Sequence, residues 1–184
     1  AFRNEVVEVD EVNQKGEVIR RKELMELPAV VDDETMPKES WLVDFCRAER
    51  QQGRKVLIYL RQTGTRDIQD RILKILRDGG VRAEVLSSGV NPRKREEWIA
   101  RRVIGLDALV VNPKLVATGL DLITFSSVVF LEIEYSLYVL WQSLRRVWRL
   151  GQTKPVKAIF SVYNDTMESR ALALIGAKMK AAQL

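Results

Sequence analysis

The stretch Lys55-Val56-Leu57-Ile58-Tyr59-Leu60 is apolar after its first residue, and a helical pattern over about residues 65–78 follows it and ends at Gly79-Gly80. The same alternation of strand and helix continues to a last helix that starts near Thr166. We expect further strands over residues 81–86, 107–111, 128–132 and 156–162, and further helices over residues 39–52, 92–102 and 136–149. Continuous apolar strands that alternate with helices of about 10 to 15 residues are typical of a parallel sheet covered on both faces. The sequence therefore predicts an α/β fold whose ligands bind beyond the carboxyl ends of the strands.

The first 38 residues differ in pattern from the rest of the chain. Two alternating segments, Glu5–Val9 and Glu17–Arg21, flank a turn that contains Asn13-Gln14-Lys15-Gly16, which predicts a short β-hairpin. An acidic segment bounded by Pro28 and Pro37 follows, and we assign it no catalytic role. We therefore divide the chain into an N-terminal hairpin and linker, residues 1–38, and an α/β domain, residues 39–184.

The composition excludes several classes of protein. The 184 residues are enough for about one domain, and no run of about 18 apolar residues is present, so we expect no membrane span. A single cysteine, Cys46, excludes an internal disulfide framework and a zinc site, and we expect it to be a small buried side chain. The absence of histidine excludes a Ser-His-Asp triad and a histidine metal site. No basic segment followed by an apolar one opens the chain, and we therefore expect a cytoplasmic protein.

The net charge of +5 is unevenly distributed along the chain. Residues 1–40 contain 11 acids and 6 bases, whereas residues 41–184 contain 14 acids and 24 bases. The second part therefore has a net charge of +10, which suits nucleic acid or nucleotide phosphates. A solubilising surface charge explains the same counts.

A cluster of arginines occupies Gln142-Ser143-Leu144-Arg145-Arg146-Val147-Trp148-Arg149-Leu150-Gly151-Gln152, a stretch that contains no carboxylate. At about 100° per residue, Gln142, Arg146 and Arg149 lie within about 60° of one another on a helix, with Arg145 beside them. The opposite side of this helix, which would anchor it, contains Leu137, Leu140, Trp141, Leu144, Val147 and Trp148. The cluster predicts an anionic ligand, although cations near the C-terminal end of a solvated helix are also favourable.

The sequence lacks the loops that commonly bind nucleotide phosphates. Neither G-x-x-x-x-G-K-[ST] nor G-x-G-x-x-G follows a strand. The arginines can therefore serve phosphoryl transfer only on a nucleotide held largely by another domain, where a supplied arginine raises the rate about 10³- to 10⁵-fold. A small-molecule α/β enzyme is disfavoured, because the chain has neither a phosphate loop nor an obvious catalytic base.

Two segments resemble motifs of superfamily 2 helicases. Residues 112–122, Asn-Pro-Lys-Leu-Val-Ala-Thr-Gly-Leu-Asp-Leu, resemble motif V, and residues 142–152 resemble motif VI in the Q-x-x-x-R-x-x-R-[IL]-G-Q form of Swi/Snf-type DNA translocases. Three further similarities are weaker. Residues 56–62 are similar to motif IV, residues 86–95 to the motif segment two secondary-structure elements later, and residues 164–168 to the start of the final helix. The resemblance covers about residues 39–180 and departs from the Swi/Snf pattern at Pro113–Val116.

This resemblance implies the C-terminal RecA-like lobe of a two-lobed ATP-dependent motor, a three-layer α/β domain with a mostly parallel sheet. It implies that Arg146 and Arg149 are catalytic arginine fingers on ATP bound by the N-terminal RecA-like lobe of the same protein, which would also hold Mg²⁺. Gln142, Gly119 and Asp121 would contribute to ATP binding, with Asp121 near the ribose or the arginines. The residues implied to bind nucleic acid, with DNA favoured over RNA, are Gln62, Thr63, Gly64, Ser88, Gly89, Asn112, Lys114 and Thr118. Alone, the chain is expected to be inactive.

Simpler interpretations stay open for several of these residues. Gly119 also fits a turn glycine, and Asp121 a turn or capping residue. Trp98 and Trp141 are expected in the core rather than as platforms for base stacking. The alternative function is a non-catalytic α/β module that holds nucleic acid or a protein through the same basic loops. An upstream lobe with G-x-x-x-x-G-K-[ST] would favour the motor over the module.

Overall fold

The computed structural model describes residues 2–12, 18–28, 34–61, 67–116 and 119–181, which fall into two units, Ala1–Thr35 and Met36–Leu184. The first unit is an antiparallel hairpin of β1 (Phe2–Val12) and β2 (Val18–Pro28), in which Phe2 lies opposite Pro28. Its strands are longer than the alternating pattern predicted. The predicted helix over residues 39–52 is α1 (Pro37–Gln51), which places the start of the α/β unit at Met36.

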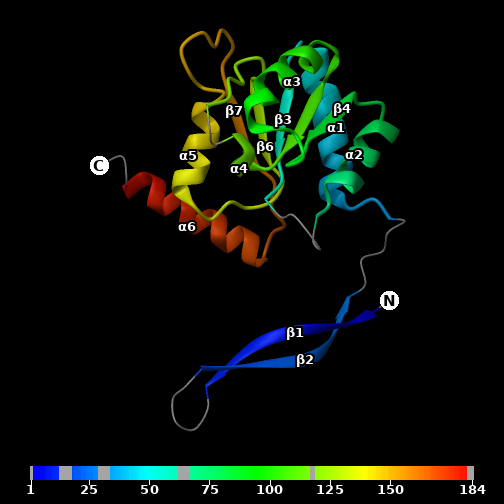
Figure 1. Ribbon diagram of the computed structural model, residues 1–184, viewed down its shortest axis with the longest axis vertical. Helices are drawn as coiled ribbons and strands as arrows, with labels where there is room; N and C mark the ends of the chain where they lie inside the picture. Colours follow the sequence, from blue (N-terminus) through cyan, green and yellow to red (C-terminus); the bar gives the residue numbers. More distant parts are fainter. Residues whose placement is uncertain (1, 13–17, 29–33, 62–66, 117–118, 182–184) are drawn as a thin grey trace. The chain divides into compact units, whose positions relative to one another are not determined.

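The second unit contains a sheet of five parallel strands in the order β4-β5-β3-β6-β7. The strands are β3 (Val56–Tyr59), β4 (Ala83–Leu86), β5 (Ala108–Val111), β6 (Ser127–Phe130) and β7 (Lys157–Phe160). Because the first of them, β3, lies in the centre, the chain adds strands on one side of it and then on the other (Figure 1). The loops after β3, β5 and β6 therefore meet at the point where the strand order reverses, which is where such sheets bind ligands.

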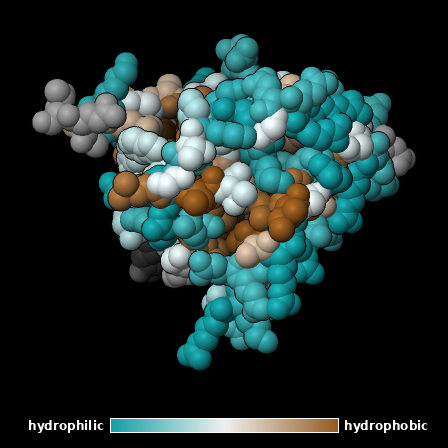
Figure 2. All heavy atoms as spheres, turned by 90° about the horizontal axis from the view of Figure 1, so that it is seen from above, coloured by the Kyte–Doolittle hydropathy of each residue, from teal (hydrophilic) through white to brown (hydrophobic). Residues whose placement is uncertain are grey.

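Helices cover both faces of this sheet. They are α1, α2 (Gln69–Asp78), α3 (Arg95–Arg102), α4 (Pro113–Val116), α5 (Leu137–Arg145) and α6 (Met167–Ala181), with the 3₁₀ turns η2 (Pro92–Lys94) and η3 (Val103–Gly105). One face packs against α1 and α2, and the other against α3, α5 and α6 (Figure 1). The predicted three-layer α/β fold is confirmed. Figure 2 shows the surface at the end of the sheet where the strands begin, and apolar residues form a patch there among hydrophilic ones.

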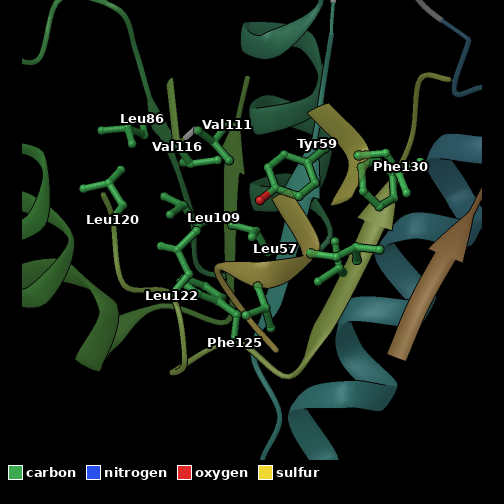
Figure 3. Close-up of a cluster of buried hydrophobic side chains, with 14 of the residues drawn as sticks. Leu57, Tyr59, Leu86, Leu109, Val111, Val116, Leu120, Leu122, Phe125 and Phe130 are labelled. Carbon is green, nitrogen blue, oxygen red and sulfur yellow. The ribbon is translucent and has the colours of Figure 1, made fainter. Parts of the chain in front are cut away.

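The two cores explain the continuous apolar run of β3. Val56, Ile58 and Leu60 pack on the α1/α2 face, whereas Leu57 and Tyr59 pack on the opposite face, and all of them are buried. Successive strand residues point to opposite faces, so a strand covered on both sides must be apolar at every position. Figure 3 shows the larger core, whose labelled residues are Leu57, Tyr59, Leu86, Leu109, Val111, Val116, Leu120, Leu122, Phe125 and Phe130. Cys46 is buried on the α1/α2 face, as predicted.

Two predicted helices differ from the observed ones. The helix expected over residues 92–102 begins as the 3₁₀ turn η2, which is capped by Asn91, whose Oδ1 accepts a hydrogen bond from Arg93 N at 3.0 Å. The helix expected over residues 136–149 ends at Arg145. This second difference changes the geometry of the arginine cluster.

Candidate functional site

The arginines follow α5 rather than lying on it. The helix starts after Ser136, whose Oγ accepts a hydrogen bond from Val139 N, and it is anchored by the buried Leu140 and Leu144. At its end, Arg146 N donates to Ser143 O and Val147 N to Leu144 O, so the last turn tightens toward 3₁₀ geometry. Residues 146–152 then form a turn, which we call the arginine turn.

The prediction that Gln142, Arg146 and Arg149 share one helix face is therefore wrong. Gln142 lies half-buried on α5, whereas Arg146 caps the helix and Arg149 lies beyond it. The carbonyl of Arg146 accepts a hydrogen bond from Leu122 N at 3.1 Å, so a tertiary contact replaces the next helical bond. Trp148 was predicted to anchor the helix, but its side chain is 65% exposed, although its N–H still donates to Leu144 O at 2.8 Å.

The two candidate catalytic arginines lie in different environments. Arg146 is half-buried, and its Nε atom is buried. Burial raises the pKa of Tyr59 above its ordinary value, and the positive charge of Arg146 opposes that shift only in part; the Tyr59 hydroxyl donates a hydrogen bond to Ser143 O at 3.3 Å. Arg149, in contrast, has a side chain that is 45% exposed.

Asp121 and Arg149 come together in the structure, although they lie in different motifs. Arg149 Nη1 lies 3.9 Å from Asp121 Oδ2, and Asp121 Oδ1 accepts a hydrogen bond from Ile123 N at 3.3 Å. The carboxylate near the arginines thus comes from a distant segment. Because both side chains are well exposed, the pair contributes at most about 1 kcal/mol. Gly119 is exposed with a φ of 74°, a left-handed conformation that glycine adopts without strain.

A second group of predicted residues lies at the carboxyl ends of β4 and β5. Ser88 and Gly89 are exposed in the turn after β4, and Lys114 is exposed at the start of α4. Ser88, Asn112 and Lys114 line a cavity of about 310 Å³ together with Asp67, Gln69, Ser87 and Leu115. Gln62, Thr63, Gly64 and Thr118 lie outside the described residues.

Asn112 has a mainly internal role. It is 6% exposed, its Nδ2 donates to Arg61 O at 2.8 Å, and its Oδ1 accepts from Lys114 N at 2.9 Å. The side chain therefore fixes the loop after β3 to the start of α4. Arg149 lies at the other end of the strands, on a turn that precedes β7 and packs against residues just before β6 (Figure 1). The arginine turn is therefore at the amino ends of these strands, and not beyond the carboxyl ends where the sequence predicted the ligands.

The sequence pattern of the helicase conserved C-terminal domain family matches residues 37–151. The chain belongs to this family. Two Schizosaccharomyces pombe proteins are similar to it: an uncharacterized ATP-dependent helicase, 28% identical over 100 residues, and the ATP-dependent helicase rhp16, 28% identical over 101 residues. These alignments cover 53% and 54% of this chain but only 10% and 12% of the two relatives, so the chain spans about a tenth of their length.

The C-terminal part of the Fun30 ATPase domain has a similar fold. Its crystal structure matches with a TM-score of 0.62 and 19% sequence identity, over 75% of this chain and 44% of that chain. The resemblance to the C-terminal lobe of Swi/Snf-like superfamily 2 helicases is confirmed by the family match, the helicase relatives and this fold.

In this helicase C-terminal domain, the loop after β6 holds residues that the motifs did not single out. Arg61 N donates to Glu132 Oε2 at 2.5 Å, and Arg61 Nε lies 3.9 Å from Oε2 of the buried Glu134. Glu134 Oε1 also accepts from Ser136 N at 2.8 Å, and the guanidinium of Arg61 lies over the Tyr135 ring. The two carboxylates join the loops after β3 and β6. Their position directly after an apolar strand was the available sequence signal.

Trp98 and Trp141 are half-buried, and Trp98 packs against the larger core as predicted, with the guanidinium of Arg102 4.4 Å from its ring centroid. Arg95, which the helicase resemblance included, is buried and donates to Val90 O and Leu115 O. It supports the turn after β4 from inside. Among the described residues, no helix combines the length and apolarity needed to cross a membrane.

Proposed function

We propose that this chain is the second motor lobe of an ATP-dependent DNA helicase or translocase. Arg146 and Arg149 act on the γ-phosphate of ATP that a first RecA-like lobe of the same protein binds. The family match and the ATP-dependent helicases among its relatives support this function, and the small share of those relatives that the chain spans leaves room for a first lobe.

The observation that carries the proposal is the loose pair between Arg149 and Asp121. Its 3.9 Å separation and the exposure of both partners leave the guanidinium weakly held. A phosphate group presents more negative charge than one carboxylate and accepts bidentate hydrogen bonds from a guanidinium. Arg149 therefore exchanges its contact with Asp121 for the phosphate when the lobes close, and Asp121 holds it ready when they open.

The other residues of the site have supporting roles in this proposal. Arg146 adds positive charge from its half-buried position at the end of α5, and Gln142 contacts the phosphates from α5. Gly119 lets the backbone pass close to the nucleotide, because it adds no side chain at an exposed left-handed position. ATP itself supplies the phosphoryl group that is transferred to water.

The residues of this lobe fit the phosphates but not a metal ion. Within the described ranges, no cluster of three or more His, Cys, Asp or Glu side chains is placed to hold one. We therefore assign Mg²⁺ to the first lobe, and the neutralisation of charge that grows on the phosphate to the arginine turn.

We assign nucleic acid, with DNA favoured over RNA, to the carboxyl ends of β4 and β5. Ser88, Gly89 and Lys114 are exposed there, and the cavity beside them suits a backbone phosphate. Gln62, Thr63, Gly64 and Thr118 keep the roles that the helicase motifs imply. Asn112 acts by positioning, because its side chain is buried and bonded within the protein.

Steady-state ATP hydrolysis by the full-length protein tests the proposal. Arg149→Ala should lower kcat by about 10³-fold or more while changing the KM for ATP far less, because the arginine acts on charge that develops in the transition state. Arg145→Ala is the matched control, since Arg145 is an exposed arginine of the same segment that we place outside the site. Turnover at the wild-type level in both variants would contradict the proposed role of this lobe in ATP hydrolysis and favour a non-catalytic binding module.

A further inference from the structure

Gln152, the last residue of the arginine turn, has a side chain that the proposed function does not use. Its Nε2 donates to Ile123 O at 2.9 Å and to Phe125 O at 3.0 Å, and it also lies 3.2 Å from Val147 O. Its Oε1 accepts a hydrogen bond from Lys154 N at 3.0 Å. The carboxamide thus joins three stretches of backbone: the segment after Asp121, the start of the arginine turn and the start of the loop that leads to β7.

Further contacts hold the arginine turn against residues 121–125. Leu122 N donates to Arg146 O at 3.1 Å, and Gln152 N donates to Arg149 O at 3.1 Å. Gly151 has a φ of 96°, and a Cβ at this position would lie 3.7 Å from Ile123 Cδ1. The backbone is therefore fixed on both sides of Arg149, while the Arg149 side chain is left exposed.

From this geometry we propose that Gln152 is a positioning residue that acts through Arg149. It fixes the arginine turn to the segment that carries Asp121, and so sets where the Arg149 guanidinium stands when the lobes close. This inference rests on the proposed role of Arg149. Displacing a reacting group by about 1 Å costs about 10²-fold in rate, so a tether of this kind affects kcat without touching the substrate.

Only a carboxamide satisfies this position. The three carbonyl oxygens require a donor, and Lys154 N requires an acceptor, so a neutral side chain with both is needed. Gln152→Met keeps the length of the side chain and removes these hydrogen bonds. Gln152→Glu keeps the shape and places an oxygen against carbonyl oxygens, unless that oxygen is protonated and can donate.

The variants are compared with wild type by ATP hydrolysis of the full-length protein. We expect kcat to fall about 10-fold in Gln152→Met and about 10- to 100-fold in Gln152→Glu at pH 8, with KM for ATP within about threefold of wild type. Thr153→Ala, at the exposed neighbouring position, is the control and should match wild type. Melting temperatures of all variants are measured in parallel.

A pH series separates positioning from a loss of structure. The kcat of Gln152→Glu, divided by that of wild type at the same pH, should rise as the pH falls toward 6, because a protonated carboxyl again donates to one carbonyl. The charged groups on the segments packed around this position are Asp121, Arg146, Arg149, Lys154 and Arg54. They are present in both proteins, so the ratio isolates the introduced carboxyl group. Gln152→Met should show no such rise.

Hydrogen exchange of the Leu122 amide supplies a readout that does not depend on activity. The amide should lose protection in Gln152→Met and keep it in Thr153→Ala, because the arginine turn detaches only in the first. Wild-type kcat in both Gln152 variants, with Arg149→Ala inactive, would overturn the positioning role and leave the proposed function intact. Lower melting temperatures with unchanged kcat would also overturn it. Unchanged turnover in Arg149→Ala would instead overturn the proposed function.

Discussion

Asp107, next to the start of β5, offers the sharpest test of what stabilises this fold. It is 4% exposed, its Oδ1 accepts from Arg82 Nη2 at 2.6 Å, and its Oδ2 accepts from Arg82 Nε at 3.1 Å and Arg82 N at 3.0 Å. Arg50, near the end of α1, donates to the same Oδ2 at 3.3 Å. The carboxylate therefore ties β5 to the residue before β4 and to α1.

The magnitude of this contribution follows from the pKa of Asp107. Burial alone would raise that pKa, but hydrogen bonds from the side chain and backbone of Arg82, together with its charge, lower it from an ordinary 3.8 to about 2. At about 1.4 kcal/mol for each pKa unit, the lowering corresponds to about 2 kcal/mol. Because the Arg82 side chain is exposed and solvent screens its charge, we expect Asp107→Asn to lower the free energy of unfolding by about 1–2 kcal/mol at pH 7.

The pH dependence has a definite sign. The pKa of Asp107 is lower in the folded state than in the unfolded state. The contribution of Asp107 to the free energy of unfolding is therefore complete above about pH 5, and it is lost as the pH falls through the folded-state pKa of about 2. About half of it should remain at pH 3. Urea unfolding of the chain and of Asp107→Asn, followed by circular dichroism at pH 7, 4 and 3, measures the difference directly.

The control for this experiment is Asp78→Asn, an exposed carboxylate at the end of α2, which should change the free energy of unfolding by less than about 0.5 kcal/mol. A difference for Asp107→Asn that is the same at pH 7 and pH 3 would show that charge is not the cause. If Asp107→Asn and wild type had the same free energy of unfolding at pH 7, the stabilising role of Asp107 would be refuted.

The other predictions concern the core, the thiol and a turn. Burial, followed by the nearby charges of Asp107 and Glu49, raises the pKa of the Cys46 thiol to about 12. An alkylating reagent at pH 8 should therefore modify Cys46 only in urea, which mass spectrometry would show. Rapid modification without urea would contradict the burial of this side chain. Leu57→Ala should lower the free energy of unfolding by about 3–4 kcal/mol in urea titrations, because Leu57 is fully buried in the larger core, and a loss under about 1 kcal/mol would contradict that packing. Gly119→Ala should lower the free energy of unfolding by about 1 kcal/mol in the same assay, because the φ of 74° is unfavourable for alanine while a Cβ there meets open space. In the control Gly105→Ala the added Cβ also meets open space, but φ is not left-handed, so the free energy of unfolding should fall less.

The layers of the fold could be predicted from sequence because burial on both faces leaves a clear signature. The run from Val56 to Leu60 is apolar at every position, and the structure divides these side chains between two cores. A parallel strand in such a sheet has no solvent face, so its pattern differs from that of an exposed strand. The local sequence pattern was sufficient here because helices cover both faces of β3.

The end of α5 could not be predicted in the same way. The sequence periodicity predicted a helix up to residue 149, but the helix ends at Arg145. The carbonyl of Arg146 accepts a hydrogen bond from Leu122 N, which lies in a different motif. Gln152 likewise binds carbonyls 27 and 29 residues away in sequence. Tertiary contacts of this kind have no local signature, and they override the helical pattern of an amphipathic segment. For the same reason, the internal role of Asn112, whose partner is Arg61 O, was missed.

The segment from Asn112 to Phe125 is bonded to other parts of the fold at both of its ends, and it runs from the carboxyl end of β5 to the start of β6. At one end, Asn112 is bonded to the loop after β3, where we place nucleic acid. At the other, Gln152 is bonded to Ile123 and Phe125, beside the arginine turn. The bonds of the arginine turn reach residues 122–125 of the segment, and in its described part Gly119 is an exposed left-handed glycine. Since a side chain at Gly119 would restrict that backbone without filling any contact, Gly119→Ala separates the cost of bending this segment from the cost of packing it.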